Sequence, residues 1–388
     1  MNVAHPASLP DDANLRVAEA PATWAADRPV ALLSDLEFHG PGFHRLWHGL
    51  GLQGRLRFMR RVAQVGCEVA GGTAVDLIGR HLRRRETGIL RIEDGAKPLR
   101  GARQVALYAH YCASGRVSAM VLRQLRAYAA AGFAVVFVTA SPIISEADWA
   151  SVAKFAALVV HRRNHGLDFG AWRDVAGNLA ERWPNADELL LVNDSVLGPI
   201  RPLEPVFAAL RSGGEGLFGL TDSCQGGAHL QSYFLLGRGR ATVADMLAFL
   251  DAAPISTSKW LMVQRCEMGL SRFMHGRGHR VAALYGYHRL IAAVRAHPEG
   301  LAHLVPEAAR PAHAPMLSPP VLPDRPLNPV HHLWRPLVSL LGFPFLKIEL
   351  VRRNPGRLPR IGSWTTLVGP DSPSPASMLA IHLAEIGP

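Results

Sequence analysis

Residues 161–199 read HRRNHGLDFGAWRDVAGNLAERWPNADELLLVNDSVLGP, and this stretch decides the fold. A turn of the form Arg-Asn-x-Gly-x-Asp-x-Gly opens a helix, and an apolar strand further on ends in Asn-Asp-Ser. Main-chain N–H groups beside arginines suit a diphosphate, and a strand-end carboxylate suits the divalent cation that accompanies one. The stretch therefore predicts chemistry on a sugar that is carried by a nucleotide.

Strands and helices alternate on both sides of this stretch. The expected strands are apolar without a polar alternation: 105–109, 133–139, 157–161 and 188–193. Helical spacing over 117–128 and 170–182 separates them. Strands that are buried on both faces and separated by helices are typical of an α/β fold with a mainly parallel sheet. Because ligands of such sheets bind outside the carboxyl ends of the strands, we expect both polar motifs at one edge.

Changes in composition, including a proline-rich stretch, divide the 388 residues into five expected parts. They are a flexible N-terminal tail, 1–30; a basic, helical N-terminal region, 31–102; an α/β domain, 103–290; a Pro-rich linker, 291–330; and a C-terminal extension, 331–388. The linker is expected from the run of prolines between Pro306 and Pro329.

The formal net charge of +11 indicates anionic partners. Nucleic acid is not expected among them, because no basic patch interleaved with aromatic residues and no known binding motif occurs. The stretch from Gly42 to Gly88 is basic, and its arginines include Arg55, Arg57, Arg60, Arg61, Arg80, Arg83, Arg84 and Arg85. The apolar residues at helical spacing among them are Leu52, Leu56, Met59, Val62 and Ala63. We favour a solvated surface helix, and a helix on a membrane surface stays open.

The N-terminus lacks the apolar h-region of a signal peptide, and the longest apolar run, 129–140, is too short to span a bilayer. The four cysteines lie far apart without a CxxC pair, which indicates reduced thiols. We expect a cytoplasmic protein, with peripheral contact at the inner face of the membrane.

Short motifs follow one another in order between about residues 103 and 356. They are AHYC at 109–112, RRNHGLDFGAW at 162–172, LLLVNDSVLGPI at 189–200, FGLTDS at 218–223, HLQSYFLLG at 229–237, CEMGLSRFMHGRGH at 266–279, NPVHHLW at 328–334 and GFPFLKIELVRRNP at 342–355. In this series the chain resembles the rhamnan synthesis protein F family.

The resemblance implies a GT-A-like nucleotide-diphospho-sugar transferase fold and a glycosyltransferase of bacterial cell-surface polysaccharide assembly, often linked to rhamnose. A nucleotide-sugar donor and a lipid-linked or polysaccharide acceptor are the implied partners. The chain departs from the family pattern at Cys112, where His-Tyr-Asp is usual. It also lacks the Asp-x-Asp that many GT-A enzymes carry at a strand end.

Asn193, Asp194 and Ser195 are the candidates for the cation site. A cation that bridges two phosphates needs oxygen ligands, and Mn²⁺ or Mg²⁺ is the expected ion. Asp194 is the first choice as ligand, with Ser195 beside it and Asn193 in contact with the donor. The competing interpretation is a strand-ending turn, for which Asn, Asp and Ser are common residues.

Arg163, Asn164, Gly166 and Asp168 are further candidates for donor binding. Arginine offers paired donors to a diphosphate, and glycine allows a close approach of the backbone. Asp168 has a structural alternative as a helix N-cap. His229 and Gln231 follow the motif at 218–223 and are expected to line the sugar or phosphate pocket, although a lone histidine at a strand start is more often structural.

Inversion requires a base that deprotonates the acceptor hydroxyl. Glu267 is our first choice, because it lies at the edge of the inward stripe of its helix, where a carboxylate is costly unless it is used or paired. Asp222 is the rival base, and an ion pair is the structural alternative for Glu267. A second hypothesis also stays open: a non-catalytic carbohydrate-binding or polysaccharide-assembly protein that keeps the same fold.

Overall fold

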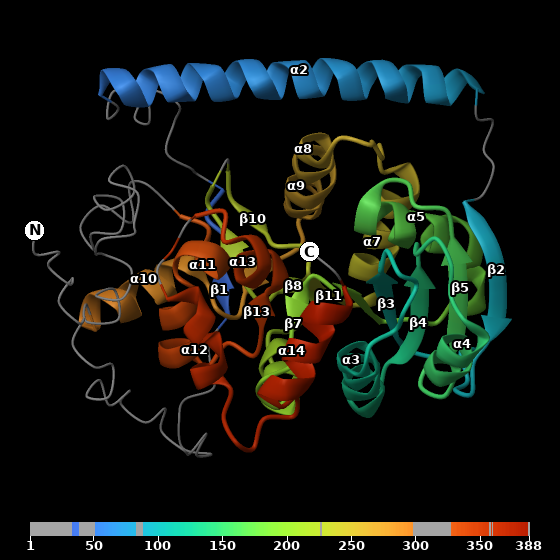
Figure 1. Cartoon of the computed structure of the whole chain (residues 1–388). Coiled ribbons are helices and arrows are strands. Elements are labelled where there is room, and N and C mark those ends of the chain that lie inside the picture. The colour runs from blue at the N-terminus through green and yellow to red at the C-terminus, as the bar shows by residue number, and fades with distance from the viewer. Residues whose placement is uncertain are drawn as a thin grey trace, which may run out of the picture. The chain divides into compact units, whose positions relative to one another are not determined.

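In the computed structural model, a nine-stranded sheet with helices on both faces forms the centre of the molecule (Figure 1). The structure describes residues 33–38, 51–82, 88–225, 227–297, 327–356, 358 and 360–386. The expected tail at 1–30, Arg83 to Arg85 and most of the expected linker, 298–326, lie outside the described residues.

The sheet has the strand order β1-β12-β8-β11-β6-β3-β4-β5-β2. The strands are β1 (Ser34–Asp35), β2 (Ile89–Asp94), β3 (Gln104–His110), β4 (Ala134–Thr139), β5 (Leu158–Arg162), β6 (Glu188–Asn193), β8 (Gly216–Gly219), β11 (Phe234–Arg238) and β12 (Val281–Ala283). The pairs β6–β3, β3–β4, β4–β5 and β8–β12 are parallel, whereas β1, β2 and β11 run against their neighbours. The expected α/β fold with a mainly parallel sheet is confirmed.

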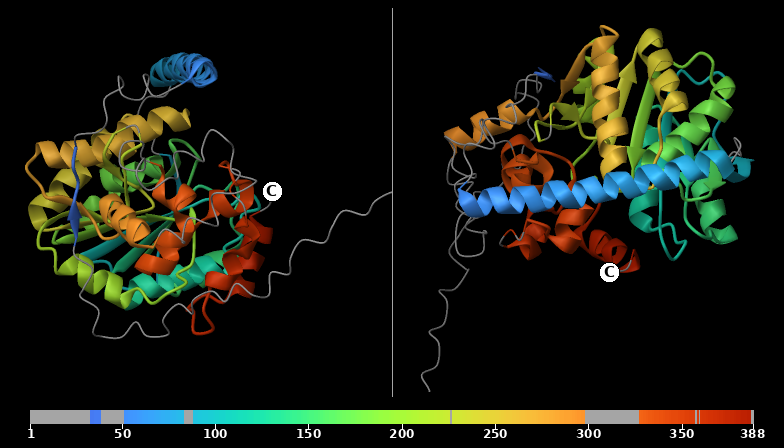
Figure 2. Two further views of the ribbon diagram at one scale, coloured as in Figure 1. Left: turned by 90° about the vertical axis from the view of Figure 1, so that its left-hand side faces the viewer. Right: turned by 90° about the horizontal axis from the view of Figure 1, so that it is seen from above.

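Helices cover both faces of this sheet (Figure 2). The longer ones are α2 (Leu52–Leu82), α3 (Ala119–Ala130), α4 (Glu146–Ala153), α5 (Leu167–Leu179), α6 (Glu204–Arg211), α7 (Arg240–Ala252), α9 (Met268–Gly276), α10 (Tyr287–Ala296), α12 (Trp334–Leu341) and α14 (Ala376–Glu385). Alternate residues of β3 enter two separate hydrophobic clusters, Tyr108 on one face and Leu107 on the other. Burial on both faces explains why the strands read as continuous apolar runs.

The structure differs from the expected elements in three places. The apolar run 229–236 is two strands, β10 (His229–Leu230) and β11, because residues 231–233 turn between two sheets. Antiparallel edge strands β1 and β2 precede residue 103, so the sheet extends into the expected N-terminal region. The helix expected around Glu267 is α8 (Lys259–Met262), a π-helical turn η3 (Val263–Glu267) and α9 in succession.

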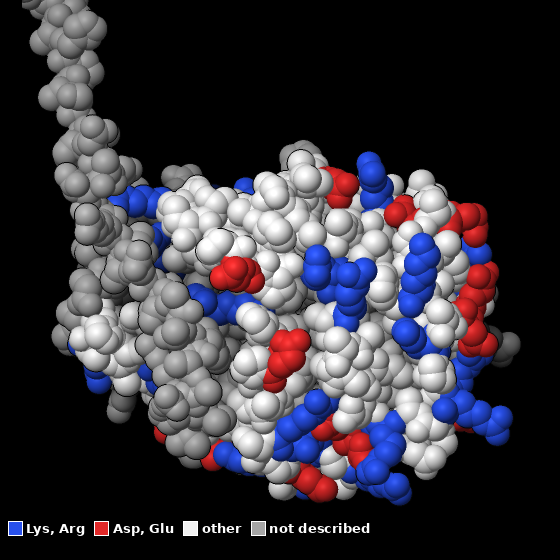
Figure 3. Space-filling model, turned by 90° about the horizontal axis from the view of Figure 1, so that it is seen from below, with Lys and Arg blue, Asp and Glu red and all other residues white. Residues whose placement is uncertain are grey.

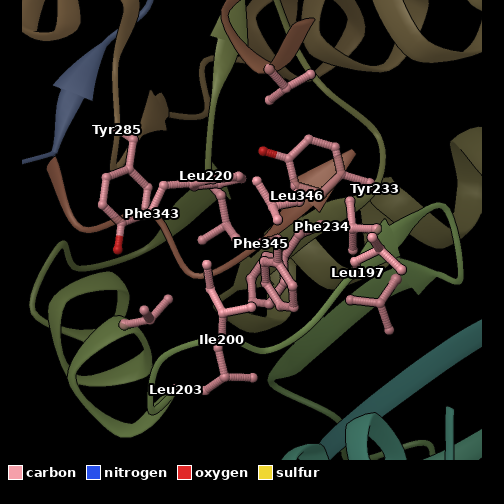
Figure 4. Packing of buried hydrophobic residues seen from close by; sticks show 14 of the residues in the cluster. Leu197, Ile200, Leu203, Leu220, Tyr233, Phe234, Tyr285, Phe343, Phe345 and Leu346 are labelled. Atoms are coloured by element: carbon pink, nitrogen blue, oxygen red, sulfur yellow. The ribbon is translucent and has the colours of Figure 1, made fainter. Parts of the chain in front are cut away.

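The described C-terminal residues pack into the same core as the α/β part. Phe343, Phe345 and Leu346 lie against Leu197 and Ile200 (Figure 4). This packing continues into a short antiparallel pair of β13 (Leu346–Lys347) and β7 (Val196–Leu197), which comes directly after β6. The C-terminal segment is therefore fixed beside the carboxyl end of the central strands.

None of the described helices is long and apolar enough to cross a membrane. The expected basic helix exists as α2, which begins at Leu52. It contacts α8, because Glu68 accepts a hydrogen bond from the Ser258 hydroxyl at 2.9 Å.

Candidate functional site

A cavity of about 650 Å³ opens at the carboxyl ends of β3 and β6. The predicted residues that line it are Asp168, Asn193, Asp194, Ser195, His229, Gln231 and Glu267. They come from the start of α5, the end of β6, β10 and η3, which are far apart in the sequence. The volume lies in the range of small-molecule sites, about 300–1,000 Å³.

A larger hollow, of about 1070 Å³, lies at the other ends of the same strands, beside Gln104, Ala134 and Glu188. Two of its carboxylates are paired, since Glu188 binds two arginines and Asp187 binds Arg103. We place the site in the smaller cavity, because ligands of parallel sheets bind at the carboxyl ends of the strands.

A chain of hydrogen bonds crosses the floor of the cavity. The Lys347 ammonium donates to Ser195 Oγ at 2.8 Å, and that hydroxyl donates to Asn193 Oδ1 at 2.5 Å. The Asn193 amide donates to Asp168 Oδ2 at 2.6 Å. A cation from the C-terminal segment is thereby linked to a carboxylate of α5 through the two side chains that flank Asp194.

Lys347 is placed by the pairing of β13 with β7, in which it lies opposite Val196. Gly198 allows this pairing, because its φ is +130° and a Cβ there would lie 2.9 Å from Phe345 and from the Pro344 carbonyl. Burial lowers the pKa of the Lys347 ammonium. No carboxylate of the described residues forms an ion pair with it, and it contacts the Ser195 hydroxyl and the Tyr233 ring. The ammonium is thus available to an anion in the cavity.

Asp194 lies at the end of β6, and its carboxylate accepts the Tyr111 N–H at 2.8 Å. Burial raises the pKa of this carboxyl to about 7, and the nearby Asp168 adds to the rise. A partly buried carboxylate that forms no ion pair among the described residues is a group that a divalent cation would stabilise.

The residues present fit a cation that is held largely by substrate. Within the described ranges no group of three or more His, Cys, Asp or Glu is gathered closely enough to hold a metal ion. The Ser195 hydroxyl already bonds Asn193 and Lys347. Asp194 is therefore the protein ligand that remains, and such ions are often bound by one or two carboxylates together with phosphates and water.

Glu267 reaches the cavity from the last residue of η3. Its Oε1 accepts the Ser232 N–H at 2.8 Å. A π-helical turn displaces a residue from the regular helical spacing and is frequent at functional sites. The main-chain bond fixes one oxygen of the carboxylate and orients the other.

Asp222, the rival base, does not line the cavity, although the next residue, Ser223, does. Its side chain is buried and accepts the Tyr287 N–H at 2.6 Å. Burial raises the pKa of Asp222 to about 6. In the fold, this carboxylate binds the first main-chain N–H of α10.

Arg163, Asn164 and Gly166 do not line the cavity either. Gly166 precedes α5 at a φ of +76°, and a Cβ there would lie 2.9 Å from Ile255, so close packing requires the glycine. Arg162, the neighbouring arginine of this turn, is buried and pairs with Asp174 at 2.7 Å. The motif therefore shapes the turn before α5.

His229 and Gln231 line the cavity and also have structural bonds. His229 Nδ1 lies 2.7 Å from the Gly227 carbonyl oxygen. Gln231 accepts a bond from the Thr221 hydroxyl at 2.7 Å. Both side chains are nearly buried, so they shape the wall of the cavity.

Sequence reasoning missed several lining residues: Tyr111, Lys259, His331, Arg352 and Arg353. Arg352 and Arg353 end α13 (Ile348–Arg353), which begins directly after Lys347. The run of basic residues in GFPFLKIELVRRNP was the available signal. Cys112, at the position where the family pattern has Asp, also lines the cavity and is buried.

The chain is 28% identical over 241 residues to "Virulence protein VirA" of Vibrio anguillarum, a match that covers 59% of this chain and 72% of that relative. It is 27% identical over 210 residues to "Uncharacterized protein y4gN" of Sinorhizobium fredii, with 53% and 54% covered. A solved mannosyltransferase, PcManGT of Pyrobaculum calidifontis in complex with GDP-Man and Mn²⁺, is similar at a TM-score of 0.30 and 10% identity, with 72% of this chain and 85% of that chain covered. Residues 135–252 match the rhamnan synthesis protein F family, which confirms the resemblance expected from the motifs.

Proposed function

We propose that this chain is a glycosyltransferase that moves a sugar from a nucleotide-diphosphate donor to a glycan acceptor. The observation that carries the proposal is the meeting of Asp194, Lys347 and Glu267 in one cavity at the carboxyl ends of β3 and β6. A cation-binding carboxylate, an ammonium without an ion pair and a second carboxylate are the groups that such a transfer uses.

In this proposal the diphosphate of the donor lies beside Lys347. The ammonium would exchange part of its bond with Ser195 for a phosphate oxygen and would stabilise the charge that develops there. Arg352 and Arg353, at the end of α13, line the same cavity. A guanidinium and an ammonium suit phosphate oxygens by charge and by hydrogen bonding.

Asp194 is the protein ligand that we propose for a divalent cation, Mn²⁺ or Mg²⁺. When bound, such an ion neutralises the phosphate oxygens of the leaving group. Its binding requires the ionised form of Asp194, which burial disfavours in the free protein. Cation and donor should therefore bind together, because the cation lowers the cost of ionising this carboxyl and the phosphate oxygens of the donor complete the ligands of the cation.

Glu267 is the base that we propose for the acceptor. The acceptor oxygen forms a bond to the anomeric carbon as the bond from that carbon to the phosphate oxygen breaks. The acceptor proton passes to the Glu267 carboxylate, and the electron pair of the broken bond stays on the diphosphate. This sequence inverts the anomeric centre. The Ser232 N–H, at 2.8 Å from Oε1, orients the carboxylate for it.

The match to the rhamnan synthesis protein F family supports a cell-surface polysaccharide or lipid-linked glycan as acceptor and rhamnose as a candidate sugar. Donor contact by Arg163, Asn164 and Gly166 stays a prediction, because these residues do not line the cavity. Asp168 and Asn193 are proposed to position the donor through the chain of bonds that ends at Lys347.

A donor screen tests the proposal. The full chain is mixed with UDP- and dTDP-sugars, with Mn²⁺, Mg²⁺ or a chelator, and binding and donor hydrolysis are measured. We expect binding of at least one donor to strengthen with a divalent cation, and slow release of free sugar. A protein that binds glycans but no nucleotide-sugar under any of these conditions would be the non-catalytic assembly protein of the second hypothesis.

A further inference from the structure

Helix α2 presents one face to the rest of the chain and the opposite face outward. Glu68 accepts hydrogen bonds from the Ser258 hydroxyl and the Trp260 N–H. One turn later, Gly72 is buried, and a Cβ there would lie 2.9 Å from Ser258. These two residues define the inner face of α2, which faces α8 (Figure 1).

The outer face carries Leu52, Leu56 and Met59, with 77%, 63% and 54% of each residue exposed. At about 100° per residue, these three lie within about 60° of one another and roughly opposite Glu68 and Gly72. Three large apolar side chains that point away from the core on successive turns have no packing role among the described residues. A face of this kind marks a contact with another surface.

Basic residues lie on both sides of this apolar stripe. Arg55 and Arg60 fall about 70° to either side of its centre, and Arg60 is exposed. The nearest acidic residue of α2 is Glu68, just past the middle of the helix, and it lies on the inner face. An apolar stripe with arginines along its borders is typical of helices that lie in the interface of a membrane with anionic lipids.

We propose that the N-terminal half of α2 docks this chain on an anionic membrane surface, with Leu52, Leu56 and Met59 among the lipid headgroups. Arg55 and Arg60 would contact lipid phosphates. The helix would lie parallel to the membrane, in keeping with the absence of a membrane-crossing helix among the described residues. The inference is independent of the proposed transferase activity, which concerns another part of the chain.

Two other charged surfaces do not combine exposed apolar residues with basic residues in this way. The face seen from below in Figure 3 carries Lys and Arg side chains interspersed with Asp and Glu, which gives no field of a single sign. The hollow at the amino ends of β3, β4 and β6 is bordered by ion pairs. Neither place joins exposed apolar residues to basic ones as α2 does.

Vesicle co-sedimentation of the full chain tests the proposal. Vesicles of phosphatidylcholine alone are compared with vesicles that also contain phosphatidylglycerol, at low and at raised salt. We expect binding to the anionic vesicles only, weakened by salt because the attraction is screened. Leu56→Glu should reduce the partition coefficient at least tenfold, and Arg60→Gln roughly fivefold, the effect of one basic residue at an anionic surface.

Ile143→Glu is the matched control, since Ile143 is 66% exposed on the loop after β4. It should bind as the unchanged chain does, and donor hydrolysis without vesicles should be the same in all three variants. Equal binding of the Leu56→Glu and unchanged chains to anionic vesicles would overturn the proposal. So would a dimer in sedimentation velocity that Leu56→Glu dissociates, because α2 would then contact a second copy.

Discussion

The ammonium of Lys347 lies 2.8 Å from the hydroxyl of Ser195, a residue 152 positions earlier in the chain. The contact joins the C-terminal segment to the end of β6, and the pairing of β13 with β7 maintains it. A lysine that is brought into a cavity without an ion pair loses hydration, which lowers its pKa. This loss of hydration is unfavourable in the free protein, and a diphosphate bound beside Lys347 would compensate for it.

Lys347→Met should weaken donor binding and transfer. Methionine keeps most of the aliphatic length, so the packing beside Tyr233 is retained while the charge is lost. We expect a loss of about 2–3 kcal/mol, roughly a hundredfold in the dissociation constant for the nucleoside diphosphate, as for other charged hydrogen bonds. Titration calorimetry measures it. Lys154→Met, at an exposed lysine at the end of α4, is the control and should bind normally.

Asp194→Asn should remove the cation dependence of donor binding. In the unchanged chain the carboxyl has a pKa of about 7, so cation-assisted binding should rise as the pH increases through about 7 and the group ionises. The asparagine variant should bind weakly at every pH, with roughly a hundredfold lower rate of donor cleavage. An unchanged pH profile and an unchanged response to Mn²⁺ in this variant would assign the cation to other residues.

The same substitution has a predicted effect on stability. Because the pKa of Asp194 is raised from 3.8 to about 7 on folding, its contribution is fully present below about 4 and is lost as the pH rises through about 7. The free energy of unfolding of Asp194→Asn relative to the unchanged chain should therefore increase from pH 4 to pH 8, by on the order of a few kcal/mol. Denaturant unfolding of both proteins at the two pH values measures this difference. A constant difference would show that the carboxyl ionises at its ordinary pH.

The alternation of apolar strands and helices was readable from the sequence because β3 to β6 are buried on both faces. The end of β6 was predicted as a site for the same reason: polar residues follow a buried strand there. The structural role of the turn at 162–166 was not predicted. The sequence does not reveal that the Arg162 side chain points inward to Asp174 while Arg163 is exposed. The approach of Lys347 depends on pairing across 152 residues, and no local pattern encodes such a pairing.

Phe345→Ala tests whether packing of the C-terminal segment supports the site. Phe345 is buried against Gly198 and the residues shown in Figure 4. Loss of a buried phenylalanine typically costs about 3–5 kcal/mol. We expect that loss in the free energy of unfolding, together with weaker donor binding under conditions where the variant is folded, because β13 carries Lys347. Ile381→Ala, at a residue that is 59% exposed, should change neither quantity measurably. Normal donor binding by folded Phe345→Ala would separate the site from this packing.

A comparison of Glu267→Gln with Asp222→Asn distinguishes the two candidate bases most directly. Glutamine keeps the size of the side chain and an oxygen that accepts the Ser232 N–H, so the fold around η3 should be retained. It cannot take a proton from the acceptor, and transfer should fall by about 10²- to 10⁴-fold while donor binding stays nearly intact. Asp222 holds the Tyr287 N–H outside the cavity, so Asp222→Asn should lower stability more than it lowers the rate of transfer. Single-turnover transfer and donor titration on both variants distinguish the roles. Normal transfer by Glu267→Gln with loss in a stable Asp222→Asn would make Asp222 the base, and normal transfer by both would remove the carboxylate base from the mechanism.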